Sequence, residues 1–291
     1  MSKSKIKSIH FSIHELMKQC RQQMSCTTFS DRTKRLEAMT KELHSLGYEP
    51  THIGRLKQKH VEILVKHWQE SGASIGTIKN RMSDLRFVCR ELNRNNVVKS
   101  NDDYNIGKRC YVPSENKALH APNFVGVTDD YIRCSIELQR VFGLRREECL
   151  KIIPAQADAG TLLHLKASWT KGGIARAIPI RTKEQRYWLN QAKSLAGKTK
   201  SLIPKDKSYI QQRRHYDRLT QAAGFKNLHG LRHAYAQTRY LEITGWRTPI
   251  DGGKPRHELS KQERLLDQQA RKIIALELGH SRVAIAKNYL A

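Results

Sequence analysis

The sequence predicts a mainly α protein with two domains: a helical first domain and an α+β second domain that contains one small β-hairpin. Apolar residues recur three or four positions apart along most of the chain, which is typical of amphipathic helices. Strand-like alternation is confined to residues 161–180. Prolines and mixed polar residues between the two regions are typical of a linker. We expect a helical domain over 1–110, whose first residues can form a flexible arm, a linker over 111–124 and the second domain over 125–291.

The first domain carries successive helical patterns over residues 12–95. Ser30 is a candidate N-cap for a helix over 30–46 that ends at Gly47. Residues 54–70 form a second expected helix, which ends at Gly72. A third helix is expected to begin at Ser74.

The helix that begins at Ser74 combines an apolar stripe with a basic one. The apolar stripe has members three or four positions apart: Ile75, Ile78, Met82, Leu85, Cys89 and Leu92. The basic stripe consists of Lys79, Arg86, Arg90 and Arg94. Such a face can lie along DNA phosphates or in a groove, but most basic helix faces are only solvated. Both interpretations stay open for these four side chains.

In the second domain, Thr128 is the expected N-cap of a helix that runs to Val141, and Arg145 opens the next helix. Residues 161–168 and 174–180 form the expected hairpin, with Lys171 at its tip. Further helices are expected over 182–195, 208–223, 229–243 and 260–278, and a final helical segment carries Tyr289.

The composition favours a polyanionic partner. There are 53 basic against 27 acidic residues, which gives a formal charge of +26, far more than solubility requires. The basic residues are scattered between apolar positions in both halves, so they do not form a disordered basic tail. Double-stranded DNA is the expected partner, and a merely basic soluble surface is the alternative.

We expect a soluble, intracellular protein. No run approaches the roughly 18 apolar residues of a membrane span, and no secretory apolar segment follows Met1. The cysteines show no CxxC pairing or metal-ligand spacing, so we expect reduced thiols without a chemical role. They are Cys20, Cys26, Cys89, Cys110, Cys134 and Cys149.

Six polar residues in chain order form a set that could cleave a phosphodiester: Arg145, Lys171, His229, Arg232, His280 and Tyr289. Two guanidiniums suit the extra negative charge of a phosphoryl transition state. A phenol oxygen can form a phosphoester that stores the bond energy for rejoining. A lysine can protonate the leaving sugar oxygen, and two imidazoles can hydrogen-bond the phosphate or move the phenolic proton.

Each motif alone has an ordinary interpretation. A hairpin turn with two glycines is common, and a tyrosine in a final helix usually packs in a core. His229 and His233 lie four positions apart, as in a zinc pair, but Gly230 stands where the catalytic glutamate of that metalloprotease motif would be and no third ligand is obvious. We expect no metal. The joint occurrence of the six residues, in order, favours DNA breakage and rejoining.

The strings around these residues resemble the motifs of the tyrosine recombinase (phage integrase) family. They are GLRREE from Gly143, TKGG from Thr170 followed by RAIPI, HGLRH from His229, and LGHS from Leu278 followed by Tyr289. The resemblance covers the chain from about residue 128 onward, and the preceding part resembles the family's helical core-binding domain more loosely.

The resemblance implies a role for each matching residue. Arg145 and Arg232 clamp the phosphate, Lys171 is the hairpin lysine and proton donor, and Tyr289 is the nucleophile. His229 and His280 occupy the two histidine positions, and Glu148 orients the arginine three residues before it. Tyr289 then forms a 3′-phosphotyrosyl intermediate, and the reaction needs no metal, ATP or other cofactor.

The resemblance also implies partners and setting. It indicates a mobile-element integrase that acts on double-stranded DNA recombination sites as a homotetramer, in which the two domains clamp the duplex. An accessory DNA-bending protein is a further candidate partner, and the expected location is the cytoplasm of a prokaryotic cell, at the nucleoid. Residues 245–259 exceed the compact family pattern and are expected to form a surface loop. Two residues follow Tyr289, whereas many members continue into a tail that docks on a neighbouring protomer.

Three alternatives stay open. A catalytically inactive DNA-binding protein of the same fold would bind DNA without forming an adduct. A type IB topoisomerase would relax plasmids without strand exchange. An RNA-binding module would bind RNA and duplex DNA alike in a salt-sensitive manner.

Overall fold

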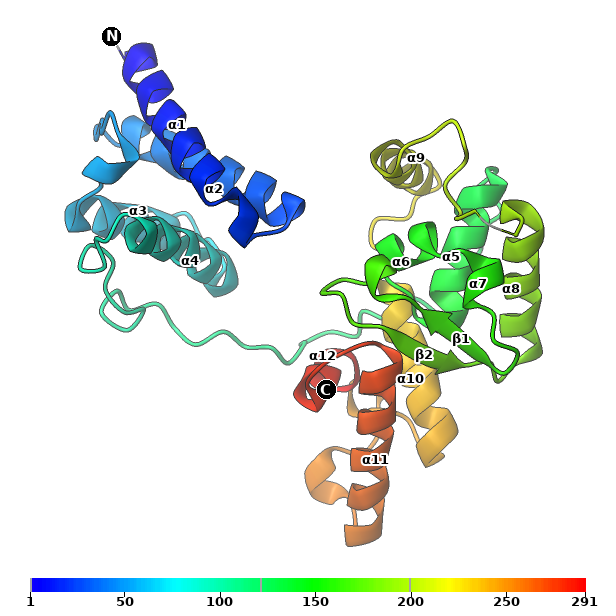
Figure 1. Cartoon of the computed structure of the whole chain (residues 1–291). Helices are drawn as coiled ribbons and strands as arrows, with labels where there is room; N and C mark the ends of the chain where they lie inside the picture. Colours follow the sequence, from blue (N-terminus) through cyan, green and yellow to red (C-terminus); the bar gives the residue numbers. More distant parts are fainter. Residues whose placement is uncertain (1, 121, 199) are drawn as a thin grey trace. The chain divides into compact units, whose positions relative to one another are not determined.

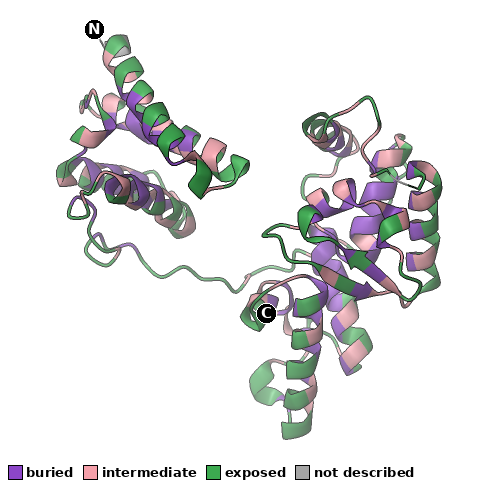
Figure 2. Ribbon diagram, viewed as in Figure 1, coloured by how far each residue is buried: buried purple, intermediate pink, exposed green. Residues whose placement is uncertain are grey.

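The structure is a computed structural model that describes residues 2–120, 122–198 and 200–291 (Figure 1). It divides into two compact units, Met1–Cys110 and Tyr111–Ala291. Each unit has its own buried apolar core (Figure 2).

Unit 1 is helical. Its helices are α1 (Ser2–Gln19), α2 (Cys26–Ser45), α3 (Gln58–Glu70) and α4 (Ile75–Glu91), with short 3-10 turns η1 (Arg21–Gln23) and η2 (Ile53–Arg55). The apolar stripe expected on α4 supplies Ile78, Met82 and Leu85 to the core, where they join Trp68 of α3. The carboxylate of Asp84 is buried between Arg32 and Arg35 of α2 and ties the two helices together.

Two helix starts in unit 1 were predicted wrongly. Helix α2 begins after Ser25 rather than Ser30, because the Ser25 side chain already accepts the hydrogen bond from the amide of Thr28. Helix α3 begins after Lys57 rather than at residue 54. The amide of Ile53 is bound to the Ser12 hydroxyl at 2.8 Å, which holds η2 as a separate turn. The start of α4 at the N-cap Ser74 is confirmed.

Unit 2 combines helices with one hairpin. Its main helices are α5 (Asp130–Phe142), α6 (Arg146–Lys151), α7 (Pro154–Ala157), α8 (Lys183–Ala196), α9 (Tyr209–Ala222), α10 (Gly230–Thr244), α11 (Lys261–Glu277) and α12 (Lys287–Leu290). Its 3-10 turns are η3 (Ala167–Trp169), η4 (Pro249–Asp251), η5 (Arg256–Glu258) and η6 (Val283–Ala286). The N-cap of α5 is Asp129 rather than Thr128, because the Asp129 carboxylate accepts the amide hydrogen bond of Ile132.

The hairpin pairs β1 (Leu162–Leu165) with β2 (Arg176–Pro179) in antiparallel register. Leu163 and Leu165 of β1 and Ile178 of β2 are buried, so one face packs on the core. The strands are shorter than predicted, because η3 buries Trp169 directly after β1 and removes that segment from the ladder. The connection between the strands contains the turn with Lys171.

In the core of unit 2, α5 packs against α8 and α10, and α10 packs against α11 (Figure 2). Gly143 sits at the close approach between the end of α5 and α10. Its φ is +62°, and a Cβ there would lie 2.5 Å from Cδ1 of Tyr235. Glycine therefore permits both the turn into Arg145 and the tight packing on α10.

Residues 245–259 form an ordered segment between α10 and α11. Gly245 ends α10 in the left-handed conformation, and η4 and η5 follow. Thr248 and Leu259 are buried, so part of the expected surface loop packs against the unit.

Candidate active site

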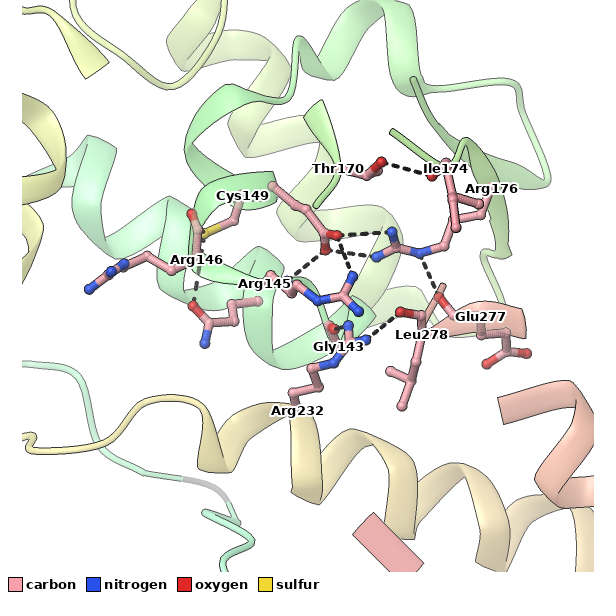
Figure 3. A network of polar contacts seen from close by, with 12 residues as sticks. Gly143, Arg145, Arg146, Cys149, Thr170, Ile174, Arg176, Arg232, Glu277 and Leu278 are labelled. Carbon is pink, nitrogen blue, oxygen red and sulfur yellow. Dashed lines mark hydrogen bonds and ion pairs between the residues drawn. The ribbon is translucent and has the colours of Figure 1, made fainter. Parts of the chain in front are cut away.

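Arg232 is the centre of the candidate site. It lies on the first turn of α10 and is 0% exposed. Its guanidinium donates hydrogen bonds to the carbonyl oxygens of Gly143, at 2.5 Å, and of Leu278 (Figure 3). Its Nη2 lies 3.4 Å from Nε2 of His280. Burial lowers the pKa of Arg232 to about 10, so the side chain still carries its charge at neutral pH.

Tyr289 faces this guanidinium. Its hydroxyl oxygen lies 3.3 Å from Nε of Arg232, and its side chain is buried on α12. The tyrosine ring packs against His233, with 4.6 Å between ring centroids, and lies 5.5 Å from the ring of His280 and 6.2 Å from that of His229. The predicted nucleophile therefore lies beside the predicted phosphate-binding arginine.

Arg145 is held at the same site by the buried carboxylate of Glu148. Its Nη1 lies 2.8 Å from Oε1 of Glu148, and its backbone amide donates to Oε2 at 2.7 Å. Arg176 of β2 binds the same carboxylate with both terminal nitrogens, at 3.0 and 2.7 Å (Figure 3). Burial alone would raise the pKa of Glu148, but the hydrogen bonds and charges of the two arginines lower it to about 2.

Arg176 is a residue of the site to which the sequence assigned no role. Besides Glu148, it binds the backbone carbonyl of Glu277 through Nε at 2.8 Å, just before the segment that carries His280. A Cβ at Gly279 would lie 2.9 Å from its Nη1. The available signal was its position on the strand that follows the Lys171 turn, three residues before Pro179.

Three histidines with lowered pKa values surround Tyr289 in the free protein. Burial, followed by the charges of Arg232 and Arg145, lowers the pKa of His280 to about 3. Burial and the neighbouring His229 lower the pKa of His233 to about 4. The pKa of His229 is also below its usual value, first through desolvation and then through the two arginines. At neutral pH the three rings are therefore neutral acceptors.

His233 was considered in the sequence only as half of a zinc pair. In the structure it packs on Tyr289 and on His229, with 5.5 Å between the two histidine ring centroids. Among the described residues, no group of three His, Cys, Asp or Glu side chains could hold a metal ion.

Lys171 lies apart from this cluster. It is exposed on the turn between the strands and makes no hydrogen bond or ion pair with the other described residues. Thr170 fixes the base of the turn by donating to the carbonyl of Ile174 at 2.8 Å (Figure 3). The lysine is therefore on a solvent-facing loop, while the other four residues of the predicted set gather around Arg232.

The predicted DNA-contact residues divide into two pairs, and Arg94 lies beyond the end of α4 at Glu91. Arg86 is bound to the carbonyl of Lys99 at 2.7 Å and to Asn101, and Arg94 is bound to the carbonyl of Gly54. Both guanidiniums are therefore already bonded to other residues of unit 1. Arg90 is exposed and pairs with Glu91 at 3.2 Å, and Lys79 is half-buried.

In the part of the chain that the structure describes, every helix is too short or too polar to span a bilayer.

Comparisons with known proteins bear on the family and the fold of this chain. A family model described as "Phage integrase, N-terminal" matches residues 8–98, and one described as "Integrase" matches residues 116–238. A comparison with curated proteins finds no match.

Several solved structures are similar to the chain at low sequence identity. One is a lambda integrase tetramer bound to a Holliday junction, with 15% identity and a TM-score of 0.60 over 97% of this chain and 77% of that one. Another is the Tn1549 transposon integrase in complex with transposon right end DNA, with 14% identity and a TM-score of 0.53 over 96% of this chain and 95% of that one. A third is the XerH recombinase bound to palindromic difH substrate, with 15% identity and a TM-score of 0.52 over 96% of this chain and 81% of that one.

These structural likenesses confirm the predicted fold class, a helical domain followed by an α+β domain. The two family models together match most of the sequence, in the order first and second domain. The chain therefore belongs to the phage integrase family of tyrosine recombinases.

Proposed function

We propose that this protein is a site-specific DNA recombinase of the integrase type, which cleaves and rejoins DNA strands through Tyr289. The observation that carries the proposal is the position of the Tyr289 hydroxyl, 3.3 Å from Nε of the buried Arg232. The same cluster contains Arg145, whose charge acts on His229, His280 and Arg232. In the proposed complex, the charges of the two arginines would bind the scissile phosphate beside the phenol oxygen.

In the proposed reaction, the Tyr289 oxygen attacks the scissile phosphorus. The new bond is a 3′-phosphotyrosyl ester, and the bond to the 5′ oxygen breaks. Lys171 donates a proton to that oxygen, because the exposed turn allows the ammonium group to reach bound DNA. The neutral rings of His229 and His280 accept the phenolic proton or hydrogen-bond the phosphate.

The two arginines act on the transition state. Their charges neutralise the developing negative charge on the non-bridging oxygens, and each is expected to contribute about 3 kcal/mol, by analogy with single oxyanion donors. The phosphotyrosyl ester conserves the energy of the broken bond. A hydroxyl of a partner strand then attacks it and restores the backbone, so the proposed reaction requires neither metal nor ATP.

The proposed partners are DNA recombination sites and further copies of this chain. The net charge of +26 favours phosphate backbones. Strand exchange between two duplexes requires several active sites at once, and the similar lambda integrase structure is a tetramer bound to a Holliday junction. We extend this to a homotetramer on DNA. An accessory DNA-bending protein remains a prediction, testable by adding host extract to the purified reaction.

The test is the formation of a covalent protein–DNA adduct. The protein is mixed with sheared DNA from candidate hosts and mobile elements and denatured in SDS, and the attached DNA is sequenced. Tyr289→Phe keeps the ring on His233 and removes only the nucleophilic oxygen, and Tyr187→Phe, at an exposed tyrosine, is the matched control. Adducts with the unsubstituted protein and Tyr187→Phe, but not with Tyr289→Phe, are expected.

Two other results would contradict the proposal. If all three proteins bind DNA without an adduct, the protein is an inactive DNA-binding member of the fold. If adducts form and a supercoiled plasmid is relaxed, but two sites are never exchanged, the activity is that of a type IB topoisomerase.

A further inference from the structure

A side-chain amide connects the helix of Tyr289 to the segment that opens unit 2. Gln237 lies on α10 and is 4% exposed. Its Nε2 donates to the backbone carbonyl of Tyr289 at 3.2 Å and to Oδ1 of Asn116 at 2.8 Å. Its Oε1 lies 3.3 Å from Nδ2 of Asn116 and 3.4 Å from Nε2 of His120. We call Gln237, Asn116 and His120 the latch.

The orientation of the Gln237 amide is fixed by these partners. A glutamine side chain offers two N–H donors and one carbonyl oxygen with two lone pairs, and the latch uses all of them. A flipped amide would place its oxygen against the carbonyl oxygen of Tyr289, where two acceptors would repel. Nε2 of Gln237 can therefore donate to the carbonyl of Tyr289 only in the observed orientation of the amide.

The segment over residues 116–120, which we call the strap, is itself held closely. The amide of Leu119 donates to the carbonyl of Gly230 at 3.0 Å. A Cβ at Gly230 would lie 2.6 Å from the carbonyl oxygen of Lys117, so strap and α10 are in direct backbone contact. Asn116 also donates to Asp251 of η4 at 3.2 Å. The strap and the 245–259 segment thus meet at the latch.

Helix α12 needs such support. It consists of Lys287–Leu290, and a single helical turn has too few internal hydrogen bonds to be stable alone. Its position, and with it the distance from the Tyr289 hydroxyl to Arg232, depends on contacts with the rest of unit 2. The bond from Gln237 is made at the residue that carries the phenol.

We propose that Gln237 is a positioning residue for Tyr289. It holds α12 on α10 so that the hydroxyl stays beside Arg232, and the strap and η4 hold Gln237 in turn. The proposal deepens the recombinase function proposed above and rests on it for its effect on cleavage. The contact by which Gln237 holds α12 on α10 can be tested without DNA.

The first test is hydrogen exchange of the C-terminal peptide, read by mass spectrometry. Gln237→Met keeps the length of the side chain and removes its hydrogen bonds. Gln212→Met is the matched control, because Gln212 is also fully buried in unit 2 and bonds a distant carbonyl, that of Leu202. The amides of 287–291 are expected to exchange about tenfold faster in Gln237→Met and at the unsubstituted rate in Gln212→Met. Equal exchange in all three proteins would overturn the latch.

The second test separates DNA binding from cleavage. On a DNA site recovered with the unsubstituted protein, Gln237→Met and Gln237→Glu are expected to slow single-turnover adduct formation by about tenfold, or about 1.4 kcal/mol, with an unchanged Kd for DNA. Gln237→Glu keeps an acceptor for Asn116 but cannot donate to Tyr289. Asn116→Ala should have a smaller effect, because Asn116 is exposed and water can replace it.

Cleavage by Gln237→Glu at the unsubstituted rate would overturn the positioning role. Failure of the proposed function has a different signature, since the unsubstituted protein would then form no adduct while the exchange test still reports on the latch.

Discussion

Arg176 and Glu148 form a two-point ion pair in which the guanidinium is 5% and the carboxylate 0% exposed at the side chain. Both terminal nitrogens of Arg176 bind the carboxylate, and Glu148 also binds Arg145. The carboxylate therefore connects β2 to the turn that presents Arg145. This pair makes Arg176 a positioning residue for the predicted phosphate clamp.

The main expected effect of replacing Arg176 is a lower free energy of unfolding. Arg176→Ala leaves Glu148 buried with one arginine partner, and the free energy of unfolding is expected to fall by about 3 kcal/mol. Urea denaturation of the purified variants measures this. Lys254→Ala, which removes an exposed ion pair with Glu263, should cost less than about 1 kcal/mol. Equal losses in the two variants would refute the role given to Arg176.

Replacing Arg145 should slow cleavage strongly and change the free energy of unfolding only slightly. Its side chain is 20% exposed, and Glu148 keeps both bonds from Arg176 when Arg145 is removed. Arg145→Ala should therefore lower the free energy of unfolding by no more than about 1 kcal/mol. The rate of adduct formation should fall by two to three decades, because a charge that stabilises the transition state is lost, roughly 3 kcal/mol. A rate within about fivefold of the unsubstituted protein would remove Arg145 from the phosphate clamp.

Local signals in the sequence were sufficient for most helix boundaries. The N-caps Ser74, Thr182, Ser208 and Ser260 are where the sequence placed them, because a cap depends on a residue and the amides two or three positions on. The start of α2 was misplaced because Ser25 and Ser30 are both acceptable caps. The sequence does not decide between them, and in the structure the Ser25 side chain makes the cap.

The predicted site could be read from the sequence only as a set of reactive residues in order. The supporting residues Arg176 and Gln237 were not predicted, because their roles arise from distant partners. Arg176 meets Glu148, which is 28 positions away, and Gln237 meets Asn116, which is 121 positions away. An arginine in a strand and a glutamine in a helix carry no local signature of such contacts.

Acid should destabilise the protein below about pH 6.5. His280 and His233 have folded-state pKa values of about 3 and 4, below the ordinary value of 6.5. The unfolded chain therefore binds protons that the folded protein does not, and stability is complete above pH 6.5 and falls as the pH drops towards 4. The window from pH 7 to 5 avoids Glu148, whose pKa of about 2 matters only at lower pH.

Thermal unfolding between pH 7 and pH 5 measures this effect. The fall in Tm should be smaller in His280→Gln and in His233→Gln than in the unsubstituted protein. It should not vanish, because burial also lowers the pKa of His10 and of His60. His164→Gln, at an exposed position of β1, is the matched control and should leave the pH dependence unchanged. An unchanged slope in both site variants would show that these rings accept protons freely in the folded protein.

Lys171 should be needed for chemistry and dispensable for folding. It is exposed on the hairpin turn, so Lys171→Ala should leave the free energy of unfolding within about 0.5 kcal/mol of the unsubstituted value. Adduct formation should slow by two to four decades if Lys171 protonates the leaving 5′ oxygen. The decisive comparison is a DNA substrate in which sulfur replaces that bridging oxygen. A thiolate leaves without a proton, so the variant and the unsubstituted protein should cleave this substrate at similar rates.

Lys166→Ala is the matched control for this lysine. Lys166 lies near the end of β1, is exposed and contacts Gln156 at 2.8 Å, and its loss should not alter cleavage of either substrate. If Lys171→Ala is slow on the sulfur substrate as well, the lysine binds DNA or stabilises charge on the phosphate instead of donating the proton. Proton donation would then have to come from another group or from water.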